Sequence, residues 1–276
     1  MSDTLRIAGA QLAPVWLHRD GTIARVVQSI TEAAADGIAL LAFPEAFVPG
    51  YPFWIEQTDG ARFDSHMQKV LHAHYLDQAV QIEAGHLDPV VDASARHGMT
   101  VVLGIIERPR DRGGHSIYAS CVTITPTHGI VTVHRKLMPT YEERLSWAPG
   151  DGHGLRSTEA IPRFVAREGR SYVLSVCSVL RRDQLGAHIP FIDDLRERLP
   201  EVISEGGTAI AAPDGTWIVE PTPHVEQRFV ADIHHARVRQ ERQNFDVAGH
   251  YGRPDVLRLQ VNRERQTIAR FDEGVT

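Results

Sequence analysis

A glutamate at the end of an apolar segment is the first candidate for chemistry in this chain. Residues 37–54 read GIALLAFPEAFVPGYPFW, and Glu45 stands at their centre. The apolar run 39–42 predicts a short buried strand that ends near Pro44, because proline cannot donate to a sheet ladder. The loop that follows holds two more prolines and four aromatic residues, so it is stiff enough to wall a pocket. Glu45 is therefore a candidate general base, and the alternative is a strand-end carboxylate that faces solvent.

A second candidate region is rich in charge. Residues 134–151 read HRKLMPTYEERLSWAPGD and break the strand pattern with two prolines. Tyr141 and Trp147 stand among the charged residues. Such a segment is either a functional loop or an ordinary surface loop.

The two cysteines, Cys121 and Cys177, are too few for a disulfide framework. Cys177 lies in SYVLSVCSVL (171–180), which predicts a buried strand. A thiol in apolar surroundings has a raised pKa and is inert, whereas a nucleophile must become a thiolate. We therefore expect Cys177 to be packed core, with a relocated nucleophile as the alternative. Cys121 is expected to be core or sheet filler in its hairpin.

The histidines show no metal-binding spacing. His72 and His74 are two apart on a predicted helix, and His234 and His235 are adjacent near a strand end. Within each pair the side chains point in different directions, so surface histidines and no metal site are expected. The glycine pairs lack the strand–glycine–helix context of a phosphate loop, and no cofactor is indicated.

Apolar periodicity predicts strands and helices in alternation, and hence a layered α/β protein. Strands are expected at 5–12, 39–43, 99–106, 171–180 and 229–233, and hairpins at 116–133 and 206–219. Helices are expected at 20–37, 63–84, 88–97 (ended by Gly98), 162–169 and 236–243.

Composition narrows the class of protein. The 276 residues, 42% of them apolar, are enough for one domain with a large core. A net charge of -6 and the lack of a dense basic run argue against a nucleic-acid partner. No segment is long and apolar enough to span a bilayer, and the first residues do not resemble a signal peptide. We expect a cytoplasmic protein without membrane partners.

Four strings carry a resemblance to a known family. They are FPEAFVPGYP around Glu45, HRKLMPTYEERLSW around Lys136, REGR (167–170) before YVLSV, and ERQNFDVAGHYGRPDV (241–256). In these strings and their order, the chain resembles nitrilases of the carbon-nitrogen hydrolase superfamily over nearly its whole length. The resemblance implies one α-β-β-α sandwich domain over residues 1–276 that forms homo-oligomers.

The resemblance also implies a reaction and roles for three residues. In the family, a cysteine thiolate adds to a nitrile carbon, and water then releases carboxylic acid and ammonia. Glu45 would be the general base, and Lys136 would stabilise the negative charge that develops on the adduct. Glu143 would match a second glutamate, which positions Lys136 and the water. The implied substrate is a small nitrile or amide.

The family's nucleophile string, approximately Cys-Trp-Glu followed by a proline, is missing from this chain. After Arg156 the sequence passes at once to Ser157 and to residues that resemble a helix lying well beyond the nucleophile. The simplest account is an internal deletion at about 156/157, on the scale of one βαβ unit of roughly 30 residues. The expected fold is therefore a nitrilase-like sandwich that lacks part of one sheet and a helix.

Three hypotheses follow from this departure. The chain is a catalytically impaired nitrilase-type hydrolase, a non-catalytic subunit that binds a ligand or co-assembles with an active paralogue, or a defective product that folds poorly. The third follows because removing interior strands exposes apolar sheet edges. The position of Cys177 relative to Glu45 and Lys136 tests the first hypothesis, whereas solubility and oligomer size separate the third hypothesis from the other two.

Overall fold

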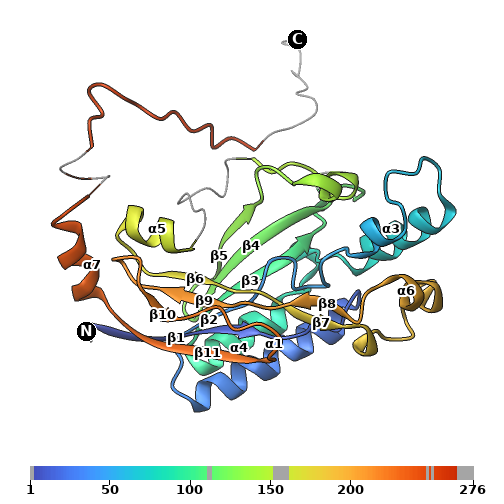
Figure 1. The fold of residues 1–276 in the computed structure, drawn as a ribbon, viewed down its shortest axis with the longest axis horizontal. Helices are drawn as coiled ribbons and strands as arrows, with labels where there is room; N and C mark the ends of the chain where they lie inside the picture. The colour runs from blue at the N-terminus through green and yellow to red at the C-terminus, as the bar shows by residue number, and fades with distance from the viewer. Residues whose placement is uncertain (1–2, 111–113, 152–161, 247–248, 250–251, 266–276) are drawn as a thin grey trace, which may run out of the picture.

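A six-stranded mixed sheet forms the centre of the fold (Figure 1). The computed structural model describes residues 3–110, 114–151, 162–246, 249 and 252–265. From edge to edge the strands are β11 (Gln227–His234), β1 (Thr4–Gln11), β2 (Leu40–Ala42), β3 (Thr100–Glu107), β4 (Tyr118–Thr125) and β5 (Gly129–Arg135). β1, β2 and β3 run parallel to one another, whereas β11, β4 and β5 pair antiparallel with their neighbours.

Two helices cover one face of this sheet (Figure 1). α1 (Arg19–Ala35) connects β1 to β2, and α4 (Asp88–His97) leads into β3. Their apolar stripes pack on the even-numbered residues of β1 and the odd-numbered residues of β3, where one large cluster is buried. α4 ends at Gly98, whose φ of +64 is a left-handed conformation that favours glycine.

A smaller β layer packs on the other face. It contains a three-stranded sheet of β10 (Trp217–Val219), β9 (Ala209–Ala211) and β6 (Val173–Ser175), and a separate pair of β7 (Val179–Arg181) and β8 (Val202–Glu205). Ile7 of β1 packs against Ile210, and a Cβ on Gly9 would lie 2.9 Å from Cγ2 of Thr208. α5 (Pro162–Gly169) contacts β6 and β9. The layers therefore follow the expected α-β-β-α order.

Gln11 joins the two β layers. Its side chain is fully buried, and its Oε1 accepts hydrogen bonds from the backbone N–H groups of Gly207 and Thr208 at 2.8 and 2.7 Å. Its Nε2 donates to the carbonyl oxygens of Thr222 and Val225 at 2.8 and 2.7 Å. One amide therefore satisfies four backbone groups where the sheets meet.

The remaining helices are mostly short. They are α2 (Trp54–Gln57), α3 (His66–Gln78), η1 (Ile82–Ala84), η3 (Tyr141–Leu145), η5 (Arg182–Gln184), α6 (Ile192–Arg198) and α7 (His235–Arg242). α2, α3 and α6 bury Trp54, Tyr75 and Leu195 in a second apolar cluster. Within the described ranges, no helix is both long and apolar enough to cross a membrane.

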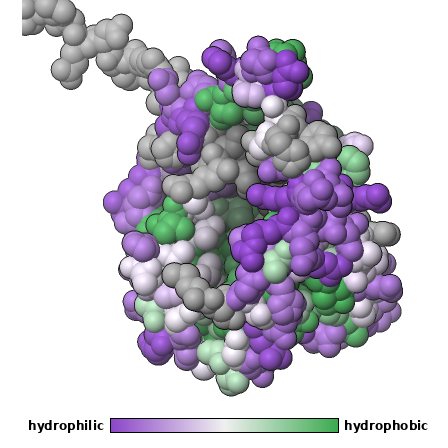
Figure 2. Space-filling view, turned by 90° about the vertical axis from the view of Figure 1, so that its left-hand side faces the viewer, coloured by the Kyte–Doolittle hydropathy of each residue, from purple (hydrophilic) through white to green (hydrophobic). Residues whose placement is uncertain are grey.

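One end of the molecule is hollowed. Figure 2 shows the end at which the N-terminus and α7 lie, with apolar residues inside the hollow and hydrophilic residues along one side of it.

The structure confirms most of the predicted elements and corrects two of them. α4, α5 and both hairpins lie where periodicity predicts them. The helix predicted at 63–84 ends at Gln78, because Ala79 and Val80 are extended and Val80 pairs with Glu107. The strand predicted at 171–180 is two strands, β6 and β7, which belong to different sheets. The predicted deletion point at 156/157 lies outside the described residues.

Candidate active site

Glu45 follows β2 directly, as the sequence predicts. The N–H of Phe43 still donates to Val102 at 2.8 Å, after which Pro44 ends the strand and Ala46 turns the chain with a φ of +52. The turn rests on β3 at Gly104, where a Cβ would lie 2.0 Å from the carbonyl oxygen of Pro44. Glycine at 104 is therefore what allows Glu45 to sit against the sheet.

Lys136 follows β5 and continues its ladder by one step. Its N–H donates to the carbonyl of Ala119 at 2.7 Å, and its own carbonyl accepts from Gly150 at 2.9 Å. Its Nζ lies 3.1 Å from Oε1 of Glu45 and 3.0 Å from Oε2 of Glu143. The structure therefore brings together all three residues that the resemblance singles out.

Glu143 is buried at the start of a short helix. It is the third residue of a capping box in η3, where its Oε2 accepts from the backbone N–H of Thr140 at 2.7 Å. Its Oε1 accepts from the hydroxyl of Tyr51 at 3.1 Å. The side chain of Glu143 is 5% exposed and that of Glu45 is 52% exposed, so one carboxylate is fixed in the protein and the other reaches solvent.

The pKa values of this group follow from these contacts. Burial disfavours charged Lys136, but the hydrogen bond from its ammonium to Glu143 and the charge of Glu45 outweigh it and raise the pKa of Lys136. Burial likewise opposes charged Glu143, but the hydrogen bonds from Thr140 and Lys136 lower the pKa of Glu143. Burial and the nearby charge of Glu143 raise the pKa of Tyr51. Lys136 and Glu143 are therefore both charged near neutral pH.

A pocket of about 290 Å³ opens beside Glu45 and Lys136. Its walls are formed by backbone atoms and by apolar and polar side chains, which come from three neighbouring strands and from the turn after β2. The residues that line it are Phe43, Glu45, Gly104, Ala119, Ser120, Cys121, His134 and Lys136. The pocket combines a fixed cation with a half-exposed carboxylate, a thiol and an imidazole.

The expectation for Cys121 is wrong. Instead of filling the core, Cys121 is exposed and lines the pocket. Cys121 lies on the face of β4 that α1 and α4 do not cover. On that side of the sheet, the strands of the smaller β layer lie over β1 instead of over β4. The sequence signal that could have found it is the alternation along β4 between buried Val122 and its neighbours.

Cys177 is not packed core either. It lies between β6 and β7, is only partly buried, and its N–H donates to the hydroxyl of Thr208 at 3.0 Å. It is not among the described residues that line the pocket. Burial raises the pKa of the Cys177 thiol, which disfavours the thiolate. These observations speak against Cys177 as a relocated nucleophile.

The paired histidines stand apart from the pocket. His234 and His235 are exposed, as expected. His72 and His74 are partly buried, contrary to expectation, and Nε2 of His74 lies 3.0 Å from the carbonyl oxygen of Leu17. Across the described residues, no three histidine, cysteine or acidic side chains are grouped to hold a metal ion. His134, which the sequence analysis did not single out, is the histidine that lines the pocket.

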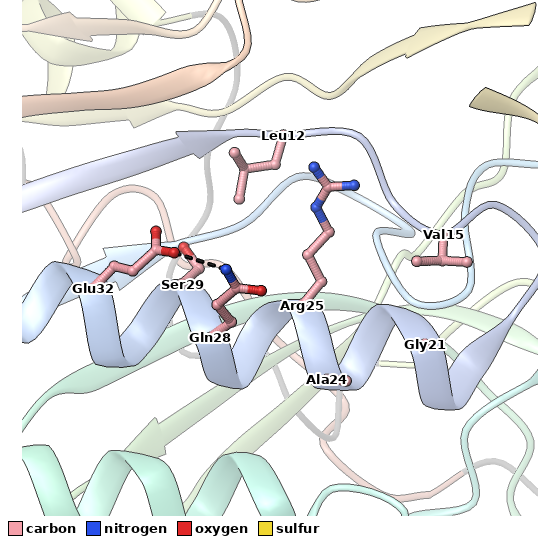
Figure 3. A pocket seen from close by; sticks show the side chains of 8 residues that line it. All are labelled: Leu12, Val15, Gly21, Ala24, Arg25, Gln28, Ser29 and Glu32. Atoms are coloured by element: carbon pink, nitrogen blue, oxygen red, sulfur yellow. Dashed lines mark hydrogen bonds between the residues drawn. The ribbon is translucent and has the colours of Figure 1, made fainter. Parts of the chain in front are cut away.

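A second hollow runs along α1 (Figure 3). Most of its polar side chains already pair with one another or with neighbours, although the buried hydroxyl of Ser29 has no hydrogen-bond partner among the described residues. Gln28 donates to Glu32 at 2.9 Å, and Arg25 contacts Glu226 at 2.5 Å. Since these charges are neutralised and the residues drawn include no cysteine, histidine or lysine, the pocket at Glu45 is the better candidate for chemistry.

Sequence comparison identifies the family. The family described as carbon-nitrogen hydrolase matches residues 6–166, which include Glu45, Lys136 and Glu143. The chain belongs to the carbon-nitrogen hydrolase family. It is 30% identical to an aliphatic nitrilase from Sinorhizobium fredii, over 94% of this chain and 96% of that protein. It is 27% identical to an arylacetonitrilase from Aspergillus niger, over 96% of this chain and 91% of that protein.

The first of these matches extends over 312 aligned residues, which is more than the 276 residues of this carbon-nitrogen hydrolase. The nitrilase therefore has residues within the match to which nothing in this chain corresponds. Solved structures agree on the fold. A carbon-nitrogen hydrolase from Helicobacter pylori G27 matches with a TM-score of 0.62 and 13% identity, over 88% of this chain and 93% of that chain. Nit3 of Saccharomyces cerevisiae matches with a TM-score of 0.60 and 13% identity, over 90% and 96%.

Proposed function

We propose that this protein is a nitrilase-type hydrolase that converts a small nitrile, with two molecules of water, to a carboxylic acid and ammonia. The observation that carries the proposal is the contact of Lys136 with both Glu45 and Glu143 at one pocket, 3.1 and 3.0 Å away. The nitrilase names of its relatives support the substrate class. A pocket of about 290 Å³ suits a small molecule.

Each of the three residues has a distinct role in this proposal. Attack on a nitrile carbon drives negative charge onto the nitrile nitrogen, and the ammonium of Lys136 stabilises that charge. Glu45, whose carboxylate is half-exposed beside the ammonium, accepts a proton from the attacking group or from water. Glu143 is buried and holds Lys136 in position. A small primary amide is the alternative substrate.

Ammonia release tests the proposal. The substrates are phenylacetonitrile and butyronitrile, and the variants are Lys136→Gln, Glu45→Gln and Glu143→Gln. Loss of a charged group that acts in the transition state lowers kcat by about 10²-fold or more. Glu142→Gln is the matched control, since Glu142 precedes Glu143 in η3 but has no hydrogen bond to Lys136 among the described contacts. Full activity in Lys136→Gln would contradict the proposal.

The alternative function is that of a non-catalytic subunit that co-assembles with an active paralogue. One observation favours it: β6 is one of the two outer strands of its three-stranded sheet in the described part of the chain, and an outer strand can pair with another chain. Sedimentation, which measures assembly, and the ammonia assay together separate the two functions. A purified homo-oligomer that releases ammonia supports the enzyme, whereas an inactive protein that assembles with an active relative supports the subunit. In either case we propose a cytoplasmic protein without a cofactor.

A further inference from the structure

The pocket beside Glu45 brings a thiol and an imidazole together from adjacent strands. Cys121 comes from β4 and His134 from β5, and both line the pocket with Lys136. We propose, on the basis of the function proposed above, that Cys121 is the nucleophile of this protein and that His134 takes the proton from its thiol. The sequence has no nucleophile string of the familiar kind, so this residue would supply the missing chemistry from a different strand.

Strand register places the two side chains on the same face. Cys121 pairs with His134 directly across the β4–β5 ladder. Side chains of such a pair project from the same face, with Cβ atoms roughly 4.5–5.5 Å apart. Lys136 is two residues beyond His134 and therefore projects from that face too. The thiol thus neighbours a proton acceptor and a cation, as an activated cysteine does.

The other neighbour of Cys121 brings in Glu45. Cys121 pairs with Gly104 across the β3–β4 ladder. A Cβ on Gly104 would point at the turn that carries Glu45, 2.7 Å from the Cα of that residue. Three adjacent strands therefore present Gly104, Cys121 and His134 in one row, with Glu45 above the first of them. A substrate in the pocket meets the thiol, the ammonium and the carboxylate together.

His134 carries an independent sign of an occupant. Its Nδ1 is buried and has no hydrogen-bond partner among the described residues, although its ring lines the pocket. Buried polar atoms in folded proteins nearly always have a partner, which is often water or a ligand. A thiol proton or a bound substrate would meet this need.

The proposed step balances without any further reactant. The Sγ–H bond of Cys121 breaks as Sγ bonds to the nitrile carbon, and His134 carries the thiol proton to the nitrile nitrogen. The product is a thioimidate. One water adds at the same carbon and ammonia leaves, which gives a thioester, and a second water releases the carboxylic acid and restores the thiol.

Two single substitutions test the assignment, with activity and fold measured together. Cys121→Ala should lose ammonia release from phenylacetonitrile by about 10³-fold or more, as expected for removal of a nucleophile. Cys177→Ala is the matched control and should stay within about twofold of wild type, because Cys177 does not line the pocket. Sedimentation and thermal unfolding check that both variants fold. Release that survives in Cys121→Ala overturns the inference, even though nitrile hydrolysis itself stands.

The pH dependence tests the partner. His134→Gln should lower kcat most near pH 7 and recover partly near pH 9–10, where a thiol ionises without help. His128→Gln, in the exposed turn between β4 and β5, should leave the profile unchanged. A loss in His134→Gln that is the same at every pH would contradict the proton-transfer role.

If the wild type releases no ammonia, the proposal of nitrile hydrolysis is contradicted, but the assignment of Cys121 and His134 can still be tested with a chemical probe. Iodoacetamide alkylation of each cysteine is followed at pH 7 by peptide mass mapping. Alkylation of Cys121 that slows about tenfold in His134→Gln, while that of Cys177 stays constant, supports an activated thiol. Alkylation of Cys121 that does not depend on His134 overturns it.

Discussion

Gly104 and Glu45 are in direct contact through the backbone, since a Cβ at position 104 would lie 2.7 Å from Cα of Glu45 and 2.0 Å from the carbonyl oxygen of Pro44. The turn after β2 thus lies on β3 without an intervening side chain. The position of the carboxylate depends on the absence of a single methyl group in the neighbouring strand.

Gly104→Ala should therefore displace Glu45 and lower activity. Both atoms that the new methyl would meet belong to the backbone, so the turn must move, at a cost of about 1–3 kcal/mol in the free energy of unfolding. Ammonia release and urea unfolding measure the two effects. Gly169→Ala is the control, because a Cβ there meets nothing within 4 Å and no positive φ is involved. Normal activity in Gly104→Ala would show that the carboxylate need not stay in place.

The ion pair of Arg135 and Glu107 should stabilise the β3–β5 region that carries the pocket. Both side chains are buried, Arg135 donates twice to Glu107 at 2.8 Å, and Ser120 donates to the same carboxylate. Arg135→Met leaves the carboxylate buried without its counter-charge and should cost about 3–5 kcal/mol in urea unfolding.

The double variant Glu107→Met, Arg135→Met supplies the control for this pair. It removes both charges and should cost less than the sum of the two single changes. If the cost of the double variant equals the sum of the two single costs, the interaction between Glu107 and Arg135 contributes little to the free energy of unfolding.

The contact of Glu143 with Lys136 should make stability depend on pH at both extremes. The pKa of Glu143 is lowered in the folded protein, so its contribution is present above the unfolded value of about 4.3 and is lost as pH falls through the folded value. The pKa of Lys136 is raised, so its contribution is present below about 10.4 and is lost as pH rises through the folded value.

Glu143→Gln should lower the free energy of unfolding by about 1–3 kcal/mol near pH 7, because a buried, charge-assisted set of hydrogen bonds is weakened. The difference from wild type should shrink as pH falls below about 4. Thermal unfolding between pH 2.5 and pH 7 measures it. A constant difference over that range would mean that the carboxylate acts through packing instead of charge.

Gln11→Leu should weaken the junction of the two β layers. The change keeps the volume but leaves the N–H groups of Gly207 and Thr208 without their acceptor, so about 2–4 kcal/mol of stability should be lost. Urea unfolding measures the loss. Gln28→Leu, on the surface of α1, is the control, and an equal cost there would mean that the buried hydrogen bonds have no special weight.

Local patterns in the sequence predict much of this fold correctly. Gly98 marks the end of α4, and Pro213, Asp214 and Gly215 mark the turn between β9 and β10. Each of these depends on neighbours along the chain, so no distant contact is needed to predict it.

Periodicity failed where a strand changes sheets. The run 171–180 is mostly apolar and reads as one strand, yet β6 and β7 pair with different partners and Cys177 lies between them. An apolar run shows that a segment is buried, but the pairing is decided by strands as distant as β8 and β9.

The residues of the pocket show the same division between what local sequence determines and what distant pairing determines. The sequence by itself determined that Glu45 ends a strand, that Lys136 and Glu143 share one loop, and that the chain resembles the nitrilase family. Only the tertiary structure decided that His134 joins Cys121 at the pocket, because the β4–β5 ladder shifts by one residue between Ile124–Ile130 and Thr123–Thr132. Side chains alternate with a period of two, so this shift puts His134 opposite Cys121 where an unbroken count from the turn would put Val133.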